Sequence, residues 1–433
     1  MLDKKDIINF LYLISFPVYG IGTYVAAAFS PTIGYFTGIV IHSLILLFYS
    51  IDILYKKNVK IRLNGLSLLM LLFLTSSIAA LFIGSSKMPH LAGSPIAFGK
   101  SAVLVTTFFA FIVVCLYNEN QYEKLAKLTF NSLSLLLLIN LIGFYGMGLS
   151  NATHSIEGRV NLPFIDGIYS GACLLAVLNL MLLYYMKKAQ DDLIRFSYLL
   201  VYFLLNLVLL YLINSRLANL VFLFILGLYV LNLIGKVKGL FPAILFTVPI
   251  LLNVGLLIYK ILSLPLFAFI MKRVNIIDVT TFNGRSFAWQ SAIDWALYDQ
   301  RGIIFGHGQG GHYFLHLMKN IAKVWNVNEA TTHLHSTTLS ILVDQGIVGL
   351  ALLILIFYKI YTYYKNEFNA RNADGIFFPV VVFIYCVMQV DMFAYHDALG
   401  GTILAFLVAT ASINPKHALK KVDTIESLTM KAL

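Results

Sequence analysis

The chain contains little charge for its length. Its 433 residues include 31 Lys and Arg and 20 Asp and Glu, so charged residues make up 12% of it. Soluble globular domains carry roughly 25% charged residues, which excludes an ordinary soluble domain. Cysteine is also scarce: Cys115, Cys173 and Cys386 all fall within apolar runs, so we expect no disulfide framework in the loops. The first apolar run lacks a small-residue cleavage site, so we expect it to be retained rather than cleaved as a signal peptide.

Long apolar runs dominate what remains. Hydrophobic residues account for 59% of the chain, and runs of about 18 or more apolar residues can cross a bilayer as helices. We therefore predict an all-α polytopic membrane protein with about 12 transmembrane helices, forming a single membrane domain over residues 1–433. The runs end at Gly, Pro, Asn or charge clusters. The predicted spans are 7–27, 33–54, 65–84, 101–117, 129–147, 167–186, 196–213, 218–235, 240–261, 337–358, 376–394 and 400–413.

Basic residues are distributed unevenly between the loops. Most of the 31 Lys and Arg residues fall on one side of the predicted spans, from Lys4 and Lys5 to the C-terminal tail. The short loops of the opposite side carry few, among them Arg159 and Arg216. Because Lys- and Arg-rich loops stay in the cytoplasm, we expect both termini to be cytoplasmic. The net charge of +11 then reflects topology and attraction to anionic lipids, and we expect no binding to nucleic acid.

One external loop is much longer than the others. It covers residues 262–336, between the ninth and tenth predicted spans. Apolar spacing predicts an amphipathic helix over 285–297 and a second amphipathic stretch from Phe314 to Trp325. The loop contains every tryptophan of the chain, a pattern typical of a segment lying at the membrane interface. These are Trp289, Trp295 and Trp325.

Three arginines are expected on the external side. Arg159 precedes the sixth span, Arg216 begins the eighth, and Arg285 begins the first helix of the long loop. A guanidinium group is always charged and forms forked hydrogen bonds to phosphate oxygens, so three converging arginines would bind a diphosphate well. Each also has a structural interpretation, because arginine near a helix end can reach lipid headgroups without any catalytic role.

Histidines and carboxylates lie beside these arginines in the predicted topology. His333 and His335 immediately precede the tenth span, and imidazole titrates near neutrality, which suits proton transfer. The alternative is that they only cap the next helix. Asp344 and Asp391 lie near span ends. A carboxylate there could orient a histidine or balance the charge of an arginine. The alternative is that both are simply solvated at the ends of helices.

The long loop contains three further histidines. His307, His312 and His316 have a spacing that would allow a metal site. No cysteine and no Glu-x-x-His pattern lies near them, so a histidine-bearing glycine-rich turn is the better interpretation. We expect neither a metal nor a cofactor.

The candidate arginines lie in short motifs. Gly158-Arg159 precedes a span that is broken by Pro163, and Asn214-Ser215-Arg216 begins another span. In the long loop, Gly284-Arg285-Ser-Phe-Ala-Trp289 is followed by Gly306-His-Gly-Gln-Gly310.

The candidate histidine lies in a fourth motif, in which His335-Ser-Thr-Thr-Leu339 is followed by Asp344-Gln-Gly-Ile-Val-Gly-Leu350. Together the four motifs cover roughly 155–350 and resemble the bacterial O-antigen ligase and polymerase superfamily, which comprises WaaL-type ligases and Wzy-type polymerases. The register with Leu339 makes His335, not His333, the family histidine. The family usually has Asn after this histidine where this chain has Ser336, whose hydroxyl can also bond locally.

The resemblance implies a GT-C-like fold and a metal-independent, inverting glycosyl transfer on the periplasmic side of the bacterial inner membrane. The donor would be a glycan on undecaprenyl diphosphate. Arg216 and Arg285, helped by Arg159, would bind the diphosphate as its charge grows. His335 would be the general base that deprotonates a sugar hydroxyl of the acceptor.

The resemblance leaves two acceptors open. A polymerase extends another undecaprenyl-linked repeat unit and works with a chain-length regulator, whereas a ligase transfers the glycan to lipid A-core. The Gly-Arg-Ser-x-x-Trp and glycine-rich motifs favour a polymerase slightly. A lipid-linked glycan flippase or transporter is a more distant alternative, because we find no internal repeat and the ionisable candidates cluster on one face rather than at the bilayer midplane.

Overall fold

Every regular element that the structure describes is helical. The computed structural model describes residues 3–56, 64–85, 95–150, 160–165, 167–237, 285–299, 302–325, 329, 332–391 and 398–413. Its helices are α1 (Lys4–Ala28), α2 (Pro31–Lys56), α3 (Gly65–Ser85), α4 (Pro95–Tyr117), α5 (Tyr122–Leu141) with a π-helical turn (Ile142–Gly146), α6 (Gly167–Lys188), α7 (Leu193–Ile213), α8 (Arg216–Val230), α13 (Arg285–Tyr298), α14 (Gly302–Phe305), α15 (Gly311–Phe314), α16 (Lys319–Trp325), α17 (Thr337–Asn369), α18 (Phe378–Val387) and α19 (Ala398–Ile413). Two 3₁₀ turns follow α8 and precede α18, at Ile234–Lys236 and Ala373–Phe377.

The apolar runs fold as the sequence predicts. A helix occupies each predicted span except 240–261, which lies outside the described residues. Among the described residues, 6 helices are long and apolar enough to cross a membrane, and several shorter apolar helices accompany them. The chain is thus a multi-pass membrane protein, while the total of about 12 spans stays a prediction.

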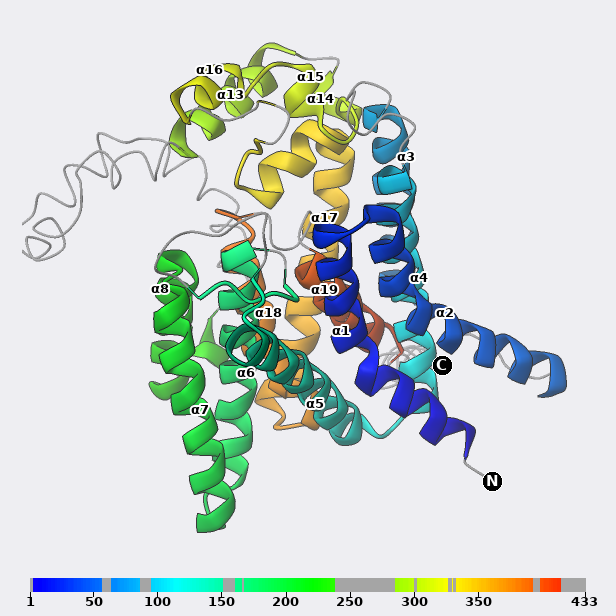
Figure 1. Cartoon of the computed structure of the whole chain (residues 1–433), viewed down its shortest axis with the longest axis vertical. Helices are drawn as coiled ribbons and strands as arrows, with labels where there is room; N and C mark the ends of the chain where they lie inside the picture. Colours follow the sequence, from blue (N-terminus) through cyan, green and yellow to red (C-terminus); the bar gives the residue numbers. More distant parts are fainter. Residues whose placement is uncertain are drawn as a thin grey trace, which may run out of the picture.

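Helix α6 forms the centre of the bundle. In its most apolar window 78% of the residues are buried, against 28% in α7. A helix that is apolar all round and buried all round belongs inside a bundle, whereas α7 presents most of its surface outward, to lipid. In Figure 1, α7 and α8 lie together on one side of the molecule and α1 to α4 on the other.

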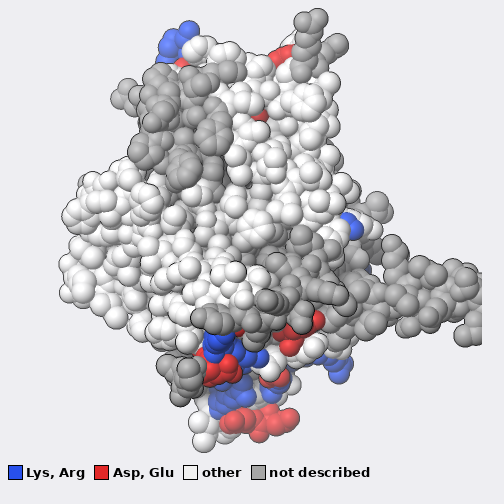
Figure 2. Space-filling view, turned by 90° about the vertical axis from the view of Figure 1, so that its right-hand side faces the viewer, with Lys and Arg blue, Asp and Glu red and all other residues white. Residues whose placement is uncertain are grey.

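The two ends of the bundle differ in charge. At one end, Lys4 Nζ lies 2.6 Å from Asp52 Oδ1, and the Tyr117 hydroxyl donates to Asp52 Oδ2 at 2.7 Å. Lys188 pairs with Glu123 at the same end, between α5 and α6. Figure 2 shows charged side chains gathered mostly at one end of the molecule, with a broad and mostly uncharged middle. Basic and acidic side chains are mixed at this end, so the predicted separation of a basic face from an opposite face stays a prediction.

The opposite end is capped by the short helices of the long loop. Figure 1 shows α13 to α16 above the start of α17, and their buried residues form a second core with the first residues of α17, separate from the core of the bundle. We call α13 to α16 the cap.

The tryptophan rings of α13 face the protein interior. Trp289 is fully buried and Trp295 is 8% exposed, whereas the apolar residues Phe287 and Leu297 are 59% and 69% exposed. The large tryptophan rings fill the core of the cap, and the expected position of the loop at the membrane interface stays a prediction. The side chain of Trp325 lies outside the described residues.

The second amphipathic stretch is not continuous. It is divided into α15 and α16, and His316 between them has a φ of +53°. A left-handed residue cannot continue a right-handed helix, so the apolar side chains of this stretch do not share one face. Met318 and Ala322 are buried while Phe314 is exposed.

Helix α17 is longer than predicted and is broken near its start. It covers Thr337–Asn369, where the sequence predicted 337–358. Gly346 interrupts it with a φ of 69° and a ψ of −166°, a conformation that essentially only glycine adopts. The first part of α17 therefore runs in a different direction from the rest (Figure 1).

Candidate functional site

A short non-helical segment, residues 332–336, connects the cap to α17 and contains both candidate histidines. His335 has a φ of +48°, in the left-handed region that is rare for residues other than glycine. Ser336 follows as the N-cap of α17, and its Oγ accepts a hydrogen bond from Leu339 N at 3.3 Å. Serine therefore supplies the local hydrogen bond expected at this position, a contact that stabilises a helix start by about 1 kcal/mol.

The two histidines lie side by side. Their ring centroids are 4.0 Å apart with an interplanar angle of 74°. Both histidines are half-buried. Thr332, which precedes them, and Leu334, which lies between them, are buried. In an extended segment alternate side chains point to opposite sides. The histidines thus project away from the cap core that buries Leu334.

The surroundings of His335 favour its neutral form. Burial lowers the pKa of His335 well below the usual histidine value, and the neighbouring charges of His333 and Arg285 lower it further. A neutral imidazole has a lone pair and accepts a proton. His335 can therefore accept a proton. Arg285 lies near the same segment, because its Nη1 donates to the Val390 carbonyl while Thr337 N donates to the carbonyls of Met388 and Asp391.

Arg285 holds a fixed position where three helices meet. It is the first residue of α13, its Nη1 donates to the Val390 carbonyl after α18 at 2.9 Å, and its Cζ lies 5.2 Å from the ring centroid of Tyr169 on α6. Only part of its five-donor fork is used by these contacts. The guanidinium group is half-buried, so it retains access to a ligand.

Arg216 is exposed at the first residue of α8. Its neighbour Leu217 packs against the cap core that contains Trp289 and Leu334, so the start of α8 reaches the same region of the molecule. Ser215, the N-cap, is buried and makes no side-chain bond to its own helix. The first N–H groups of α8 and the Arg216 guanidinium together make this end of the helix attractive to an anion.

The remaining candidates from the sequence have varied positions. Arg159 lies outside the described residues. Asp344 is buried at the bend of α17, where its Oδ1 accepts a hydrogen bond from Gly311 N at 3.1 Å. The Asp391 carbonyl accepts from Thr337 N at 2.9 Å and from Thr337 Oγ1 at 2.8 Å. Both aspartates thus help to join the start of α17 to its neighbours, and their role in orienting histidine or arginine stays a prediction.

Two residues of the site were missed in the sequence. Trp289 Nε1 donates to the Leu334 carbonyl at 2.9 Å, and His312 Nε2 donates to the Thr332 carbonyl at 2.8 Å. Burial lowers the pKa of His312, so it is neutral, with its proton on Nε2. The tryptophan of the Gly-Arg-x-x-x-Trp motif was a signal for the first contact, but nothing local connects residue 312 with residue 332.

The other loop histidines have separate partners. His307 Nε2 lies 2.8 Å from Asp299 Oδ2, while His316 Nδ1 is 3.5 Å from Glu329 Oε2. Hydrogen bonds from Gly302 N, His307 and Trp295 lower the pKa of Asp299 to about 2. Within the described part of the chain, no group of three or more His, Cys, Asp or Glu converges as metal ligands would.

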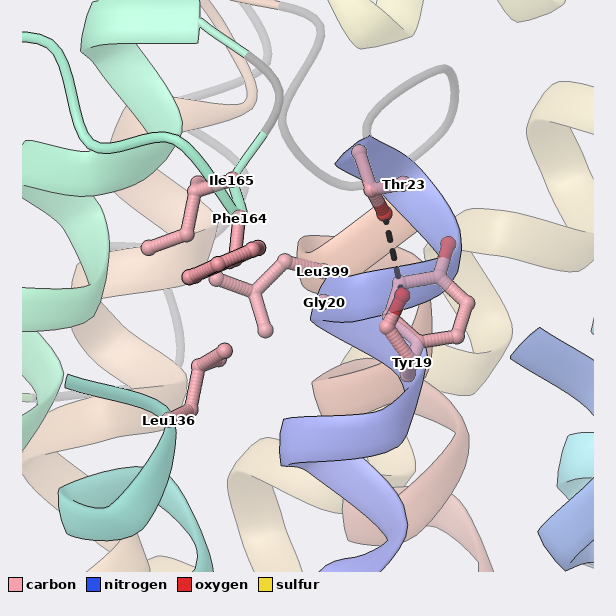
Figure 3. A pocket seen from close by; sticks show the side chains of 7 residues that line it. All are labelled: Tyr19, Gly20, Thr23, Leu136, Phe164, Ile165 and Leu399. Atoms are coloured by element: carbon pink, nitrogen blue, oxygen red, sulfur yellow. Dashed lines mark hydrogen bonds between the residues drawn. The ribbon is translucent and has the colours of Figure 1, made fainter. Parts of the chain in front are cut away.

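A narrow apolar crevice lies elsewhere, between α1, α5, α19 and the segment before α6. Figure 3 shows its lining, in which the only hydroxyl with a drawn bond, that of Thr23, donates to the Tyr19 carbonyl at 3.2 Å. Its described lining is mostly apolar and carries no Lys, Arg, His, Asp or Glu side chain, whereas the region around His335 and Arg285 carries both, and we take that region as the candidate site. The crevice is lined by Tyr19, Gly20, Thr23, Leu136, Phe164, Ile165 and Leu399.

One family model matches part of the chain. Residues 201–354 match the model described as O-antigen ligase. The matched segment contains Arg216, Arg285 and His335, and it includes most of α7, all of α8 and the cap, and the first half of α17. No curated protein matches the chain.

Proposed function

Because residues 201–354 place this chain in the superfamily of O-antigen ligases and polymerases, we propose that it transfers a glycan from undecaprenyl diphosphate to a sugar hydroxyl. The reaction takes place at the outer surface of the bacterial inner membrane, below the cap. The observation that carries the proposal is that Arg285 and the half-buried His335 meet at the same junction: Arg285 Nη1 donates to the Val390 carbonyl, and Thr337 N, two residues after His335, donates to the carbonyls of Met388 and Asp391.

The reaction needs one base and one set of positive charges. The acceptor hydroxyl attacks the anomeric carbon of the donor sugar, its proton passes to neutral His335, and the bond from that carbon to the diphosphate oxygen breaks. Direct attack inverts the anomeric centre. Arg285, Arg216 and Arg159 stabilise the charge that collects on the departing diphosphate. Because diphosphate leaves readily, the reaction proceeds without a metal or cofactor.

We assign the acceptor first to another undecaprenyl-linked repeat unit, so that the protein polymerises O-antigen or capsule repeats alongside a chain-length regulator. This follows the Gly-Arg-Ser-x-x-Trp and glycine-rich motifs of the cap. The second candidate is transfer of the finished O-antigen to lipid A-core, which the description of the matching family model favours.

The test is loss of His335. Each variant is expressed at its normal membrane level in a strain that lacks the wild-type gene. We expect His335→Ala to abolish glycan transfer. We expect His333→Ala to reduce it less, because only His335 acts as the base. The measurement is the banding pattern of surface polysaccharide on a gel. His316→Ala is the matched control, since His316 is exposed and contacts only Glu329 and Tyr313 among the described residues.

The pattern also separates the two acceptors. Loss of a polymerase leaves single repeat units on lipid A-core, whereas loss of a ligase leaves long polymer on undecaprenyl diphosphate and none on lipid A-core. Wild-type banding from the His335→Ala strain would remove the basis of the proposal.

A further inference from the structure

The backbone that carries the histidines is held by ring N–H groups of the cap. The Leu334 carbonyl accepts from Trp289 Nε1 and the Thr332 carbonyl accepts from His312 Nε2, at 2.9 and 2.8 Å. On the other side of His335, Thr337 N donates to the carbonyls of Met388 and Asp391, each at 2.9 Å. The segment is thus fixed before and after the residue that we assign as the base.

His335 needs this support because of its backbone. Its left-handed conformation, with a φ of +48°, is unfavourable for a residue with a side chain. Freed from its neighbours, the peptide would relax to an ordinary conformation and turn the imidazole elsewhere. A shift of that kind is expensive for catalysis, since the reacting groups must stay in hydrogen-bond reach.

We propose that Trp289 and His312 are positioning residues, which hold the Thr332–Leu334 backbone so that His335 meets the acceptor hydroxyl. This inference rests on the proposed function, because it takes His335 as the base. Neither residue touches the substrate; each acts through a backbone carbonyl of the histidine segment.

The indole N–H of Trp289 carries the argument. Its ring is fully buried in the cap core beside Leu334 and Met318, where phenylalanine would also pack. What phenylalanine lacks is the donor for the Leu334 carbonyl. Trp295 on the same helix provides a control for Trp289. Its Nε1 donates to Asp299 Oδ2 at 3.0 Å, so this hydrogen bond does not reach the histidine segment.

Two phenylalanine variants separate positioning from packing. In Trp289→Phe we expect the rate of glycan transfer to fall about threefold to tenfold, the effect of one lost neutral hydrogen bond. In Trp295→Phe, which also loses an indole hydrogen bond from α13, we expect a change of less than about twofold. For His312, Leu should reduce the rate while Gln, which keeps a donor, should largely restore it.

A direct readout of His335 uses diethyl pyrocarbonate, which modifies the neutral imidazole. The rate of modification of His335 in purified protein, followed by peptide fragmentation, is measured against pH. In Trp289→Phe, movement of the segment should expose His335 to water. The pH midpoint of its modification rate should then rise toward about 6.5, the usual pKa of histidine. The midpoint in Trp295→Phe should equal that of the natural chain.

An unchanged midpoint in Trp289→Phe, or an equal shift in Trp295→Phe, would overturn the positioning role. The proposed function is tested separately by including His335→Ala in the transfer assay. An active His335→Ala contradicts the base, whereas an inactive one combined with an unshifted Trp289→Phe contradicts only the positioning role.

Discussion

At the scale of single residues, the site depends on keeping one histidine neutral. Burial, His333 and Arg285 all act in the same direction on the pKa of His335. Desolvation disfavours the imidazolium ion, and a nearby guanidinium group repels it. The arginine that we assign to the diphosphate therefore also keeps the base deprotonated.

This arrangement predicts the pH dependence of the reaction. A base acts only when deprotonated, so kcat/KM should fall at acidic pH as His335 becomes protonated. Because the pKa of His335 is lowered, the midpoint of that fall should lie below about 6.5, the usual histidine value. The measurement is a pH profile of transfer by the purified protein.

His333→Gln tests whether the His333 ring contributes to the lowered pKa of His335. Removing the ring of His333 removes one of the influences that lower the pKa of His335, so the acidic midpoint should move up while Arg285 and burial still hold it below the usual value. A midpoint at or above 6.5 in the natural chain would contradict the assignment of His335 as a base of lowered pKa.

The sequence identified the charged candidates but not their supports. Arg159 and Arg216 were found because basic residues are few in the short loops of the predicted external side, whereas Arg285 and His335 were found through the motifs that contain them. Trp289 was instead expected at the membrane interface, since nothing near it in the sequence shows that it bonds to Leu334, 45 residues away. Contacts over such separations depend on how the cap folds back on α17.

At the scale of elements, the bend in α17 joins the cap to the bundle. His307 N donates to the Val343 carbonyl and Gly308 N to the Asp344 carbonyl, both at 2.9 Å. In a regular helix those two carbonyls would accept from N–H groups of the next turn. The bend at Gly346 frees them, and the glycine-rich loop of the cap satisfies them.

Gly346→Ala should therefore detach the cap. A Cβ at this position would overlap the Ile304 carbonyl oxygen, and the φ of 69° with a ψ of −166° is strained for alanine. We expect destabilisation of more than about 2 kcal/mol from strain and overlap together. Thermal unfolding in detergent measures it, and the loss of cap contacts should also reduce glycan transfer.

Gly227→Ala provides the comparison. Gly227 lies inside α8, and a Cβ built on it meets nothing within 4 Å. Alanine favours a helix over glycine by about 1 kcal/mol, so this variant should be as stable as the natural chain or slightly more so. Equal stability of both variants would show that the bend at Gly346 does not require glycine.

Helix positions were easier to predict than helix faces. The spans follow from long apolar runs, and the described helices overlap them, although some bounds differ, as in α17. The apolar spacing of α13 did not show which face is buried, because Phe287 and Leu297 belong to that spacing and are exposed. The cap has its own core instead, and two tryptophan rings occupy it.

At the scale of the whole molecule, the ends of the bundle have separate tasks. The end with Lys4, Asp52, Lys188 and Glu123 holds its helices with ion pairs. The other end carries the cap, His335 and Arg285. The proposed roles of His335 as a base and Arg285 as a phosphate ligand would suit the lipid-linked donor that we propose, whose isoprenoid would stay in the bilayer while its diphosphate lies at the surface.

This division predicts which end faces the cytoplasm. Positive loops are retained inside, so the end with Lys187, Lys188 and Arg195 should be cytoplasmic and the cap should be external. Cysteine substitutions at exposed positions report this. We expect Tyr298→Cys, in the cap and 85% exposed in the natural chain, to react with a membrane-impermeant maleimide while the cytoplasmic membrane is intact.

Asp191→Cys, in the exposed turn between α6 and α7, should react only after lysis. The natural chain sets the background, which should be low because Cys115 and Cys173 are buried and Cys386 is half-buried. The reverse pattern, with Asp191→Cys labelled in intact cells and Tyr298→Cys protected, would place His335 in the cytoplasm. A donor whose glycan lies outside the membrane could not reach it there, so the labelling result also bears on the proposed reaction.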